Sequence, residues 1–223
     1  AIEFRIEAQD QNPNHYTFWI GHEAVKKGYI WIFPKVKSGV VNLGAGDVTP
    51  KMGAKNMYDV TMEMKNRYFP DAKLLEVHGG AVPVSGNMVE YVADRFALVG
   101  DAAHHTNPMT GGGIISGMCA ADFAATRITE GLTAGNLSKE FLFGYQEAVW
   151  NRFGRNHEKE RKIASFLFTI DKKGQVRFLR ALRGMVEAKF SRFSKLWGYL
   201  QIAQVALQNA KATLKVLRQK SVA

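Results

Sequence analysis

The segment Ala97–Ile115, ALVGDAAHHTNPMTGGGII, constrains the fold more than any other part of this chain. A short apolar run ends at Gly100 and Asp101, and beyond a proline three glycines lead into a long apolar stretch. Glycine lets the chain turn sharply off a strand, and a carboxylate at a strand's carboxyl end stands where open α/β sheets bind ligands. Glycines before a helix leave its first N–H groups open at the positive end of the helix dipole. The segment predicts either a polar, partly anionic ligand held between strand and helix, or a corner whose glycines serve close packing.

A second motif, GYIWIFPKVKSGVVNLG, begins one residue before Tyr29. Tyr29, Trp31 and Phe33 alternate with isoleucines, so in a strand the three aromatic side chains share one face. Pro34 is expected to end this strand, and the following KSG turn leads into a return strand at Val40–Leu43. An aromatic wall suits a long apolar ligand, although the same pattern can also form the core face of a sheet.

The first motif resembles the second flavin motif of FAD-dependent hydroxylases and reductases with the p-hydroxybenzoate hydroxylase fold. The resemblance implies that Asp101 hydrogen-bonds the ribityl chain of FAD and that the helix N-terminus faces the pyrimidine edge of the flavin ring. The helix dipole would there stabilise the negative charge of reduced flavin. The implied cofactor-binding residues are Gly100, Asp101, Pro108, Gly111, Gly112, Gly113 and Ile114.

The aromatic motif is similar to the YxWxFP signature of the geranylgeranyl reductase family, flavoenzymes that saturate isoprenoid double bonds. The resemblance implies that Tyr29, Trp31, Phe33 and Pro34 line the substrate cavity beside the flavin. It further implies hydride transfer from reduced FAD to one alkene carbon of a prenyl lipid, while a side chain or water protonates the other carbon. No residue is assigned as the proton donor, and NAD(P)H and ferredoxin both stay open as electron donors.

Enzymes of this type begin with GxGxxG on a strand–turn–helix unit, and that motif does not occur in this sequence. We therefore expect the chain to be the carboxyl-terminal portion of a longer flavoprotein, without roughly 150 residues of dinucleotide-binding domain. On this interpretation the chain alone retains FAD weakly or not at all.

The coarse pattern predicts an α+β chain with an antiparallel sheet and a helical basic tail. The resemblance implies that the sheet is the substrate domain and that the segment after it is the carboxyl-terminal part of an FAD-binding α/β domain. The expected domains are residues 1–94 for the substrate sheet, 95–150 for the second half of the FAD-binding domain, and 151–223 for the basic helical region. The expected strands are Ile2–Ala8, Tyr16–His22, Tyr29–Phe33, Val40–Leu43, Leu74–Val84, Val89–Tyr91 and Arg95–Val99. The expected helices are Gly53–Tyr68, the stretch after the triple glycine, Asn151–Ile170, Gln175–Phe190 and Phe193–Gln219.

Basic residues are concentrated in the last third of the chain. Residues 150–223 hold 17 Lys and Arg against 4 Asp and Glu, whereas residues 1–149 hold 13 against 16. A basic amphipathic helical region can lie on an anionic membrane surface, bind nucleic acid, or form a solvated cap. No nucleic-acid-reading motif accompanies the charge, so a peripheral membrane contact and a solvated cap are the two expectations.

The single cysteine, Cys119, excludes an internal disulfide and is typical of a reducing compartment. No apolar run of about 18 residues and no signal peptide are visible. These features predict a cytoplasmic protein, peripheral on the inner face of the membrane. His104 and His105 lack partners at metal-ligand spacing, so we expect structural loop histidines and no metal site.

Two other functions fit the sequence. One is a flavin-dependent monooxygenase or halogenase on the same fold, because His104 matches the hydroxylase form of the motif, GDAAH, and halogenases also carry an aromatic-rich motif ending in proline. The other is a non-catalytic lipid-binding or membrane-docking module, which would account for the missing GxGxxG.

Overall fold

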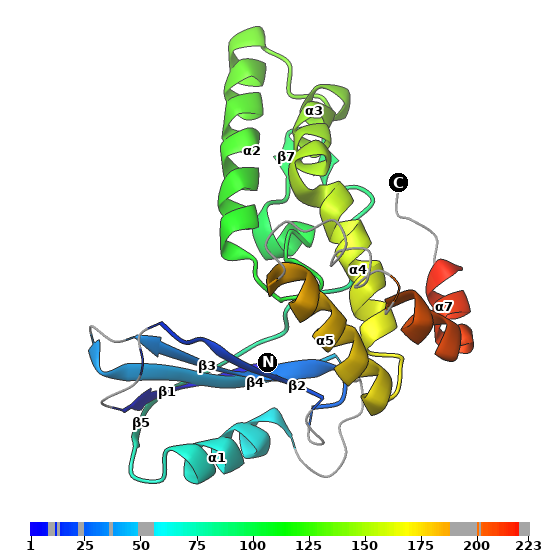
Figure 1. Cartoon of the computed structure of the whole chain (residues 1–223). Coiled ribbons are helices and arrows are strands. Elements are labelled where there is room, and N and C mark those ends of the chain that lie inside the picture. The colour runs from blue at the N-terminus through cyan, green and yellow to red at the C-terminus, as the bar shows by residue number, and fades with distance from the viewer. Residues whose placement is uncertain are drawn as a thin grey trace. The chain divides into compact units, whose positions relative to one another are not determined.

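The computed structural model describes residues 1–8, 12, 14–21, 25–35, 38–48, 56–187, 200 and 202–218. The chain divides into two compact units, Ala1–Ala81 and Val82–Ala223. The first unit contains a sheet and one helix, and the second is mainly helical (Figure 1). The boundary falls before the expected end of the sheet domain at residue 94. The assignment of the two units to substrate and FAD domains stays a prediction.

The first unit is built on a five-stranded sheet in the order β2-β3-β4-β1-β5. Every neighbouring pair is antiparallel, so the predicted antiparallel sheet is confirmed. The N-terminal strand lies inside the sheet, between β4 and β5. The strands are β1 Ile2–Glu7, β2 Thr17–Ile20, β3 Gly28–Lys35, β4 Val40–Asp47 and β5 Lys73–Gly79.

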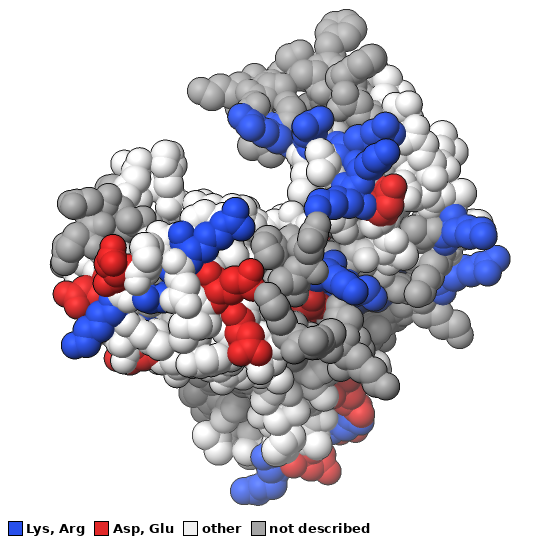
Figure 2. Space-filling model, turned by 90° about the horizontal axis from the view of Figure 1, so that it is seen from below, with Lys and Arg blue, Asp and Glu red and all other residues white. Residues whose placement is uncertain are grey.

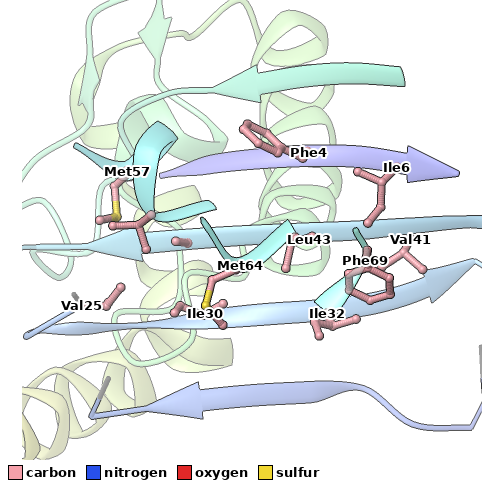
Figure 3. Close-up of a cluster of buried hydrophobic side chains, with 12 residues drawn as sticks. Phe4, Ile6, Val25, Ile30, Ile32, Val41, Leu43, Met57, Met64 and Phe69 are labelled. Carbon is pink, nitrogen blue, oxygen red and sulfur yellow. The ribbon is translucent and has the colours of Figure 1, made fainter. Parts of the chain in front are cut away.

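One face of this sheet packs against helix α1, Met57–Tyr68. Alternating side chains of the strands, such as Phe4 and Leu43, are fully buried on that face and meet Met64 of the helix (Figure 3). The helix begins where the Asn56 side chain accepts a hydrogen bond from a first-turn N–H at 2.9 Å. Side chains with period two on the strands and 3.6 on the helix therefore form one core.

Pro34 does not end its strand. It is buried within β3, opposite Val41 of β4, and β2 pairs with β3 only as far as Ile32. Proline is tolerated in a strand where no ladder partner needs its missing N–H. Two other bounds also shift: β5 ends at Gly79 instead of residue 84, and α1 begins at Met57, while residues 53–55 of the expected helix lie outside the described residues.

The second unit begins with a short hairpin, β6 Val92–Ala93 and β7 Phe96–Ala97, turning at Arg95 with φ 57°. The strand expected at residues 89–91 is therefore wrong, while β7 lies within the strand expected at residues 95–99 but is shorter. Tyr91 bonds instead to helix α3, Lys139–Val149: its N–H donates to Oε1 of Gln146 at 3.2 Å. A side chain distant in sequence takes the bond that a strand partner would have made.

Long helices make up the rest of the second unit. Helix α2, Ile114–Ala134, confirms the helix expected after the triple glycine. Helix α3 continues through a π-helical segment at Trp150–Gly154 into α4, Arg155–Leu167, which ends before the expected Ile170.

The most C-terminal helices pack on one another through a third buried cluster that includes Phe178, Val205 and Val216. Helix α5 spans Lys172–Glu187, residues 202–208 are helical, and α7 spans Ala210–Leu217. The last expected helix is interrupted at Asn209, where φ is −114° and ψ is 43°. Residues 188–199, 201 and 219 of the expected helices lie outside the described part of the chain.

Close approach of β3 to β4 requires glycine at position 28. A Cβ built on Gly28 would lie 1.9 Å from the carbonyl oxygen of Gly46, whereas a Cβ on Gly46 would meet nothing nearer than 3.5 Å. We expect Gly28→Ala to lower the free energy of unfolding by about 2–3 kcal/mol or more, because backbone must move. Gly46→Ala should change it by less than about 0.5 kcal/mol. Urea unfolding of both variants tests this, and equal effects would contradict it.

Candidate functional site

The chain turns after β7 at Gly100 and Asp101, which we call the GD turn. The φ of Gly100 is 68°, a value that favours glycine. Residues Gly100–Ala103 form one 3₁₀ turn, η2, which ends at His104 in the left-handed region with φ 55°. The Nδ1 atom of His104 lies 3.1 Å from the hydroxyl of Ser85. This turn presents the Asp101 side chain on the surface of the second unit.

Asp101 lies at the N-terminus of α2. The hydroxyl of Thr106 donates to its Oδ1 at 2.6 Å, and a Cβ on Gly113 would lie 3.0 Å from each of those two oxygens. Gly113 is the N-cap of α2, and no side chain caps the helix. An exposed carboxylate thus stands beside an uncapped helix N-terminus, as the sequence predicted.

Exposed apolar side chains surround this N-terminus. Ile114 is 80% exposed, Ile115 75% and Met118 66%. Large apolar groups left open beside a polar helix end suit a ligand with a flat ring and polar edges. Ile114 is among the predicted cofactor-binding residues.

Asn107 organises the loop that contains Pro108, a role that the sequence did not predict. Its N–H donates to the carbonyl of Gly112 and its own carbonyl accepts from Gly111, both at 2.9 Å. Its Oδ1 accepts from the N–H groups of Met109 and Thr110. The N–H of Gly111 is therefore engaged within the loop, and that of Gly112 bonds the Thr110 hydroxyl at 3.2 Å, so these two are not open to a ligand as the triple glycine suggested.

His105 is the buried anchor of the GD turn. Its side chain is 1% exposed, and its Nδ1 accepts the N–H of Gly100 at 3.1 Å. Its ring contacts Tyr91 and Phe153 edge-on at centroid distances of 5.1 and 5.6 Å, and the Phe153 ring lies tilted against that of His157 at 4.9 Å. This histidine is structural, as expected. Among the described residues, no group of three His, Cys, Asp or Glu could hold a metal ion.

Burial, together with the neighbouring His157, lowers the pKa of His105 to about 4. Burial also lowers the pKa of His157. Both rings are therefore neutral at pH 7. Neutrality matters because the Nδ1 of a protonated ring could not accept the Gly100 N–H.

These shifts predict acid sensitivity. The unfolded chain binds a proton at His105 near pH 6.5, while the folded chain binds it only at about pH 4. Stability is therefore full above pH 6.5 and falls by about 1.4 kcal/mol per pH unit toward pH 4.

His105→Gln should flatten this slope by about that amount, because its amide oxygen can still accept from Gly100 but does not titrate. Val149→Ala shortens a side chain in the buried cluster that also contains Tyr91, and it should lower the free energy of unfolding equally at every pH. Denaturant unfolding between pH 4 and 7 measures both. A slope unchanged in His105→Gln would contradict the prediction.

In the first unit, the sheet face opposite α1 carries the predicted aromatic motif. Tyr29, Trp31 and Phe33 share this face, with ring centroids 5.7 and 6.3 Å apart. Two aromatic residues of the preceding segment, Tyr16 and Phe18, contact Phe33 edge-on at 5.3 and 5.1 Å. The same alternation in Tyr16–Ile20 could have revealed them. Pro34 lies on the opposite face of the sheet, where it is buried.

The aromatic face is half-buried, and its Phe18 edge is 51% exposed. Burial raises the pKa of Tyr29, so its phenol keeps its proton at neutral pH. On the far side of β4 the face becomes polar. There Arg5 bonds Glu76 at 2.7 Å, and Glu76 also contacts His78 at 2.8 Å. The face can thus receive an apolar chain on one half only.

Known proteins similar to this chain share one family. Residues 1–82 match the geranylgeranyl reductase catalytic domain. A digeranylgeranylglycerophospholipid reductase of Methanosarcina mazei is 36% identical over 152 residues, which are 67% of this chain and 37% of that protein. The one from Methanocella arvoryzae is 35% identical over 163 residues, 73% of this chain and 41% of that protein. This chain therefore spans about two fifths of these curated relatives.

A solved structure shows the same fold. A geranylgeranyl bacteriochlorophyll reductase-like protein from Thermoplasma acidophilum superposes with a TM-score of 0.79 at 21% identity, over 95% of this chain and 54% of that one. These matches define the class of the chain, a mixed α/β protein with the fold of that structure. It belongs to the geranylgeranyl reductase family.

Proposed function

We propose that this chain forms part of an FAD-dependent reductase that saturates isoprenoid double bonds of a prenyl lipid. The observation that carries the proposal is the exposed carboxylate of Asp101 beside the uncapped N-terminus of α2. The names of the relatives point to a glycerophospholipid with two geranylgeranyl chains as the substrate class.

The residues at the GD turn fit FAD. A side chain at Gly113 would crowd Asp101 and Thr106, so glycine keeps the carboxylate against the helix end. Asp101 can accept a hydrogen bond from a ribityl hydroxyl, while the helix N-terminus favours negative charge on a flavin ring. The flavin, when bound, supplies the hydride chemistry. Gly100 and Ile114 would complete this site, while Pro108, Gly111 and Gly112 would shape its loop without offering an N–H to the ligand.

The aromatic face would hold the prenyl chain. Tyr29, Trp31 and Phe33 offer large apolar area with few polar groups, and they would exclude water from the reacting double bond. Pro34 lies on the opposite, buried side of β3, so in this proposal it would act only through the backbone of that strand. In this proposal the electrons come from NAD(P)H or ferredoxin.

We also propose a peripheral contact with an anionic membrane surface. Helix α5 exposes Lys172, Lys173, Arg177, Arg180 and Arg183, and its opposite side packs through Phe178 into the third cluster. Groups of basic side chains with few acidic neighbours are visible on one face of the molecule (Figure 2). None of the described helices is long and apolar enough to cross a membrane. Such a surface would bring the enzyme to a substrate that resides in the bilayer.

Asp101→Ala tests the flavin site. Loss of a hydrogen bond to a charged group costs about 1.5–3 kcal/mol, so the Kd for FAD should rise about 10- to 100-fold. Asp122→Ala, an exposed acid on the same helix, should leave the Kd unchanged. Flavin fluorescence titration of the full-length protein measures both. An Asp101→Ala protein that keeps FAD normally would contradict the assigned role.

The reaction has its own test. The flavin-loaded protein is reduced anaerobically and mixed with a digeranylgeranylglycerophospholipid. The proposal expects the flavin to reoxidise as double bonds are saturated, detected by mass spectrometry of the lipid. Reoxidation only by oxygen, with hydroxylation of an aromatic compound, would instead support a monooxygenase.

The membrane contact predicts a charge-dependent affinity. Each basic residue near an anionic surface contributes about 1 kcal/mol, so Lys173→Gln with Arg180→Gln should weaken binding to phosphatidylglycerol vesicles by about 30-fold. Lys35→Gln with Lys73→Gln removes the same charge from the sheet unit and should have little effect. Vesicle co-sedimentation at fixed salt measures this. If both double variants lose vesicle binding equally, the attraction depends on total charge, and the proposed contact through α5 is wrong.

A further inference from the structure

We propose that Glu3 is a positioning residue, which holds the Trp31 indole across β4 and thereby sets how long a prenyl chain the aromatic face accepts. The inference rests on the proposed function, in which this face receives the chain. It is carried by one row of residues that crosses three strands of the sheet.

The row is defined by strand register. Trp31 of β3 lies opposite Gly44 of β4, and Gly44 lies opposite Glu3 of β1. The three positions therefore share one face and one line across the sheet. A long side chain on β3 can reach β1 along this line only if the position between them carries no side chain.

Gly44 meets that condition. A Cβ at this position would lie 2.1 and 2.3 Å from Cζ2 and Cε2 of the Trp31 indole. The indole thus lies directly over the backbone of β4. Its Nε1–H donates to Oε2 of Glu3 at 3.2 Å, which fixes the far edge of the ring.

Glu3 is itself held from a second side. Nδ2 of Asn42 donates to Oε1 of Glu3 at 2.8 Å. Asn42 is buried, and its Oδ1 has no hydrogen-bond partner. Each carboxylate oxygen therefore has a donor, so the carboxylate cannot rotate without leaving a polar group unpaired.

This clamp makes the indole a flat extension of the aromatic face. Phe33 and Tyr29 flank Trp31 on the same strand, and the indole continues the apolar surface over β4. Without Glu3 the ring could turn upward from Gly44 into the space above the face. A long chain that extends over β4 would then lose its contact surface, while a short chain lying over β2 and β3 would lose little.

Variants of Glu3 separate positioning from charge. Glu3→Leu removes the acceptor and should raise KM for a substrate with twenty-carbon prenyl chains about tenfold, with kcat and KM for a ten-carbon analogue nearly unchanged. Glu3→Gln should restore KM, because its oxygen can accept the indole N–H and its amide can donate to the unpaired Oδ1 of Asn42 after an amide flip. Glu7→Leu, an exposed carboxylate on the same face of β1, should resemble the wild type.

A second measurement does not depend on turnover. The near-ultraviolet circular dichroism of Trp31, taken as the difference between the wild-type protein and Trp31→Phe, should weaken in Glu3→Leu and return in Glu3→Gln, because a fixed ring gives the stronger signal. If the signal persists in Glu3→Leu, or if KM rises equally for both chain lengths, the positioning role is overturned. A wild-type protein that shows the Trp31 signal but reduces no prenyl lipid would instead refute the proposed function.

Discussion

The hydrogen bond from the Gly100 N–H to the buried imidazole of His105 supports the rest of the GD turn. The N–H of His105 returns a bond to the Gly100 carbonyl at 3.0 Å, and its carbonyl accepts the Ser116 hydroxyl of α2 at 2.5 Å. One residue thus ties the strand end to the start of the helix. Because the ring is buried in an aromatic cluster, packing rather than solvent fixes the position of Asp101.

Residues of the basic C-terminal region also hold the GD turn and its loop in place. Glu160 of α4 accepts a hydrogen bond from Asn107 at 2.6 Å, and Phe153 packs with both buried histidines. Asn87 reaches the same segment, donating to the carbonyl of Gly154 at 2.8 Å. Net charge changes abruptly near residue 150, but the packing does not. A charge boundary reports on the surface, whereas a structural boundary depends on which side chains share a core.

The antiparallel sheet and the strand at Tyr29–Phe33 could be predicted from the sequence, whereas features set by particular distant partners could not. The alternation at Tyr29–Phe33 predicts its strand because period two is a property of neighbouring residues. Pro34 was misread because its tolerance depends on where β2 stops, and the short β6 depends on Gln146, far along the chain. The roles of Glu3 and Asn107 could not be predicted from the sequence for the same reason. Their partners, Trp31 and Glu160, are brought to them only by the fold.

The two candidate sites use glycine in the same way. In the second unit Gly113 leaves room for a carboxylate and a hydroxyl against a helix end, and in the first unit Gly44 leaves room for an indole against a strand. In each case a polar bond fixes the admitted group, Thr106 to Asp101 and Trp31 to Glu3. In the proposed function both sites would need rigid surfaces, since hydride transfer is sensitive to the placement of the reacting atoms. In each unit a glycine leaves room for a larger neighbouring group, and a hydrogen bond holds that group in a fixed position.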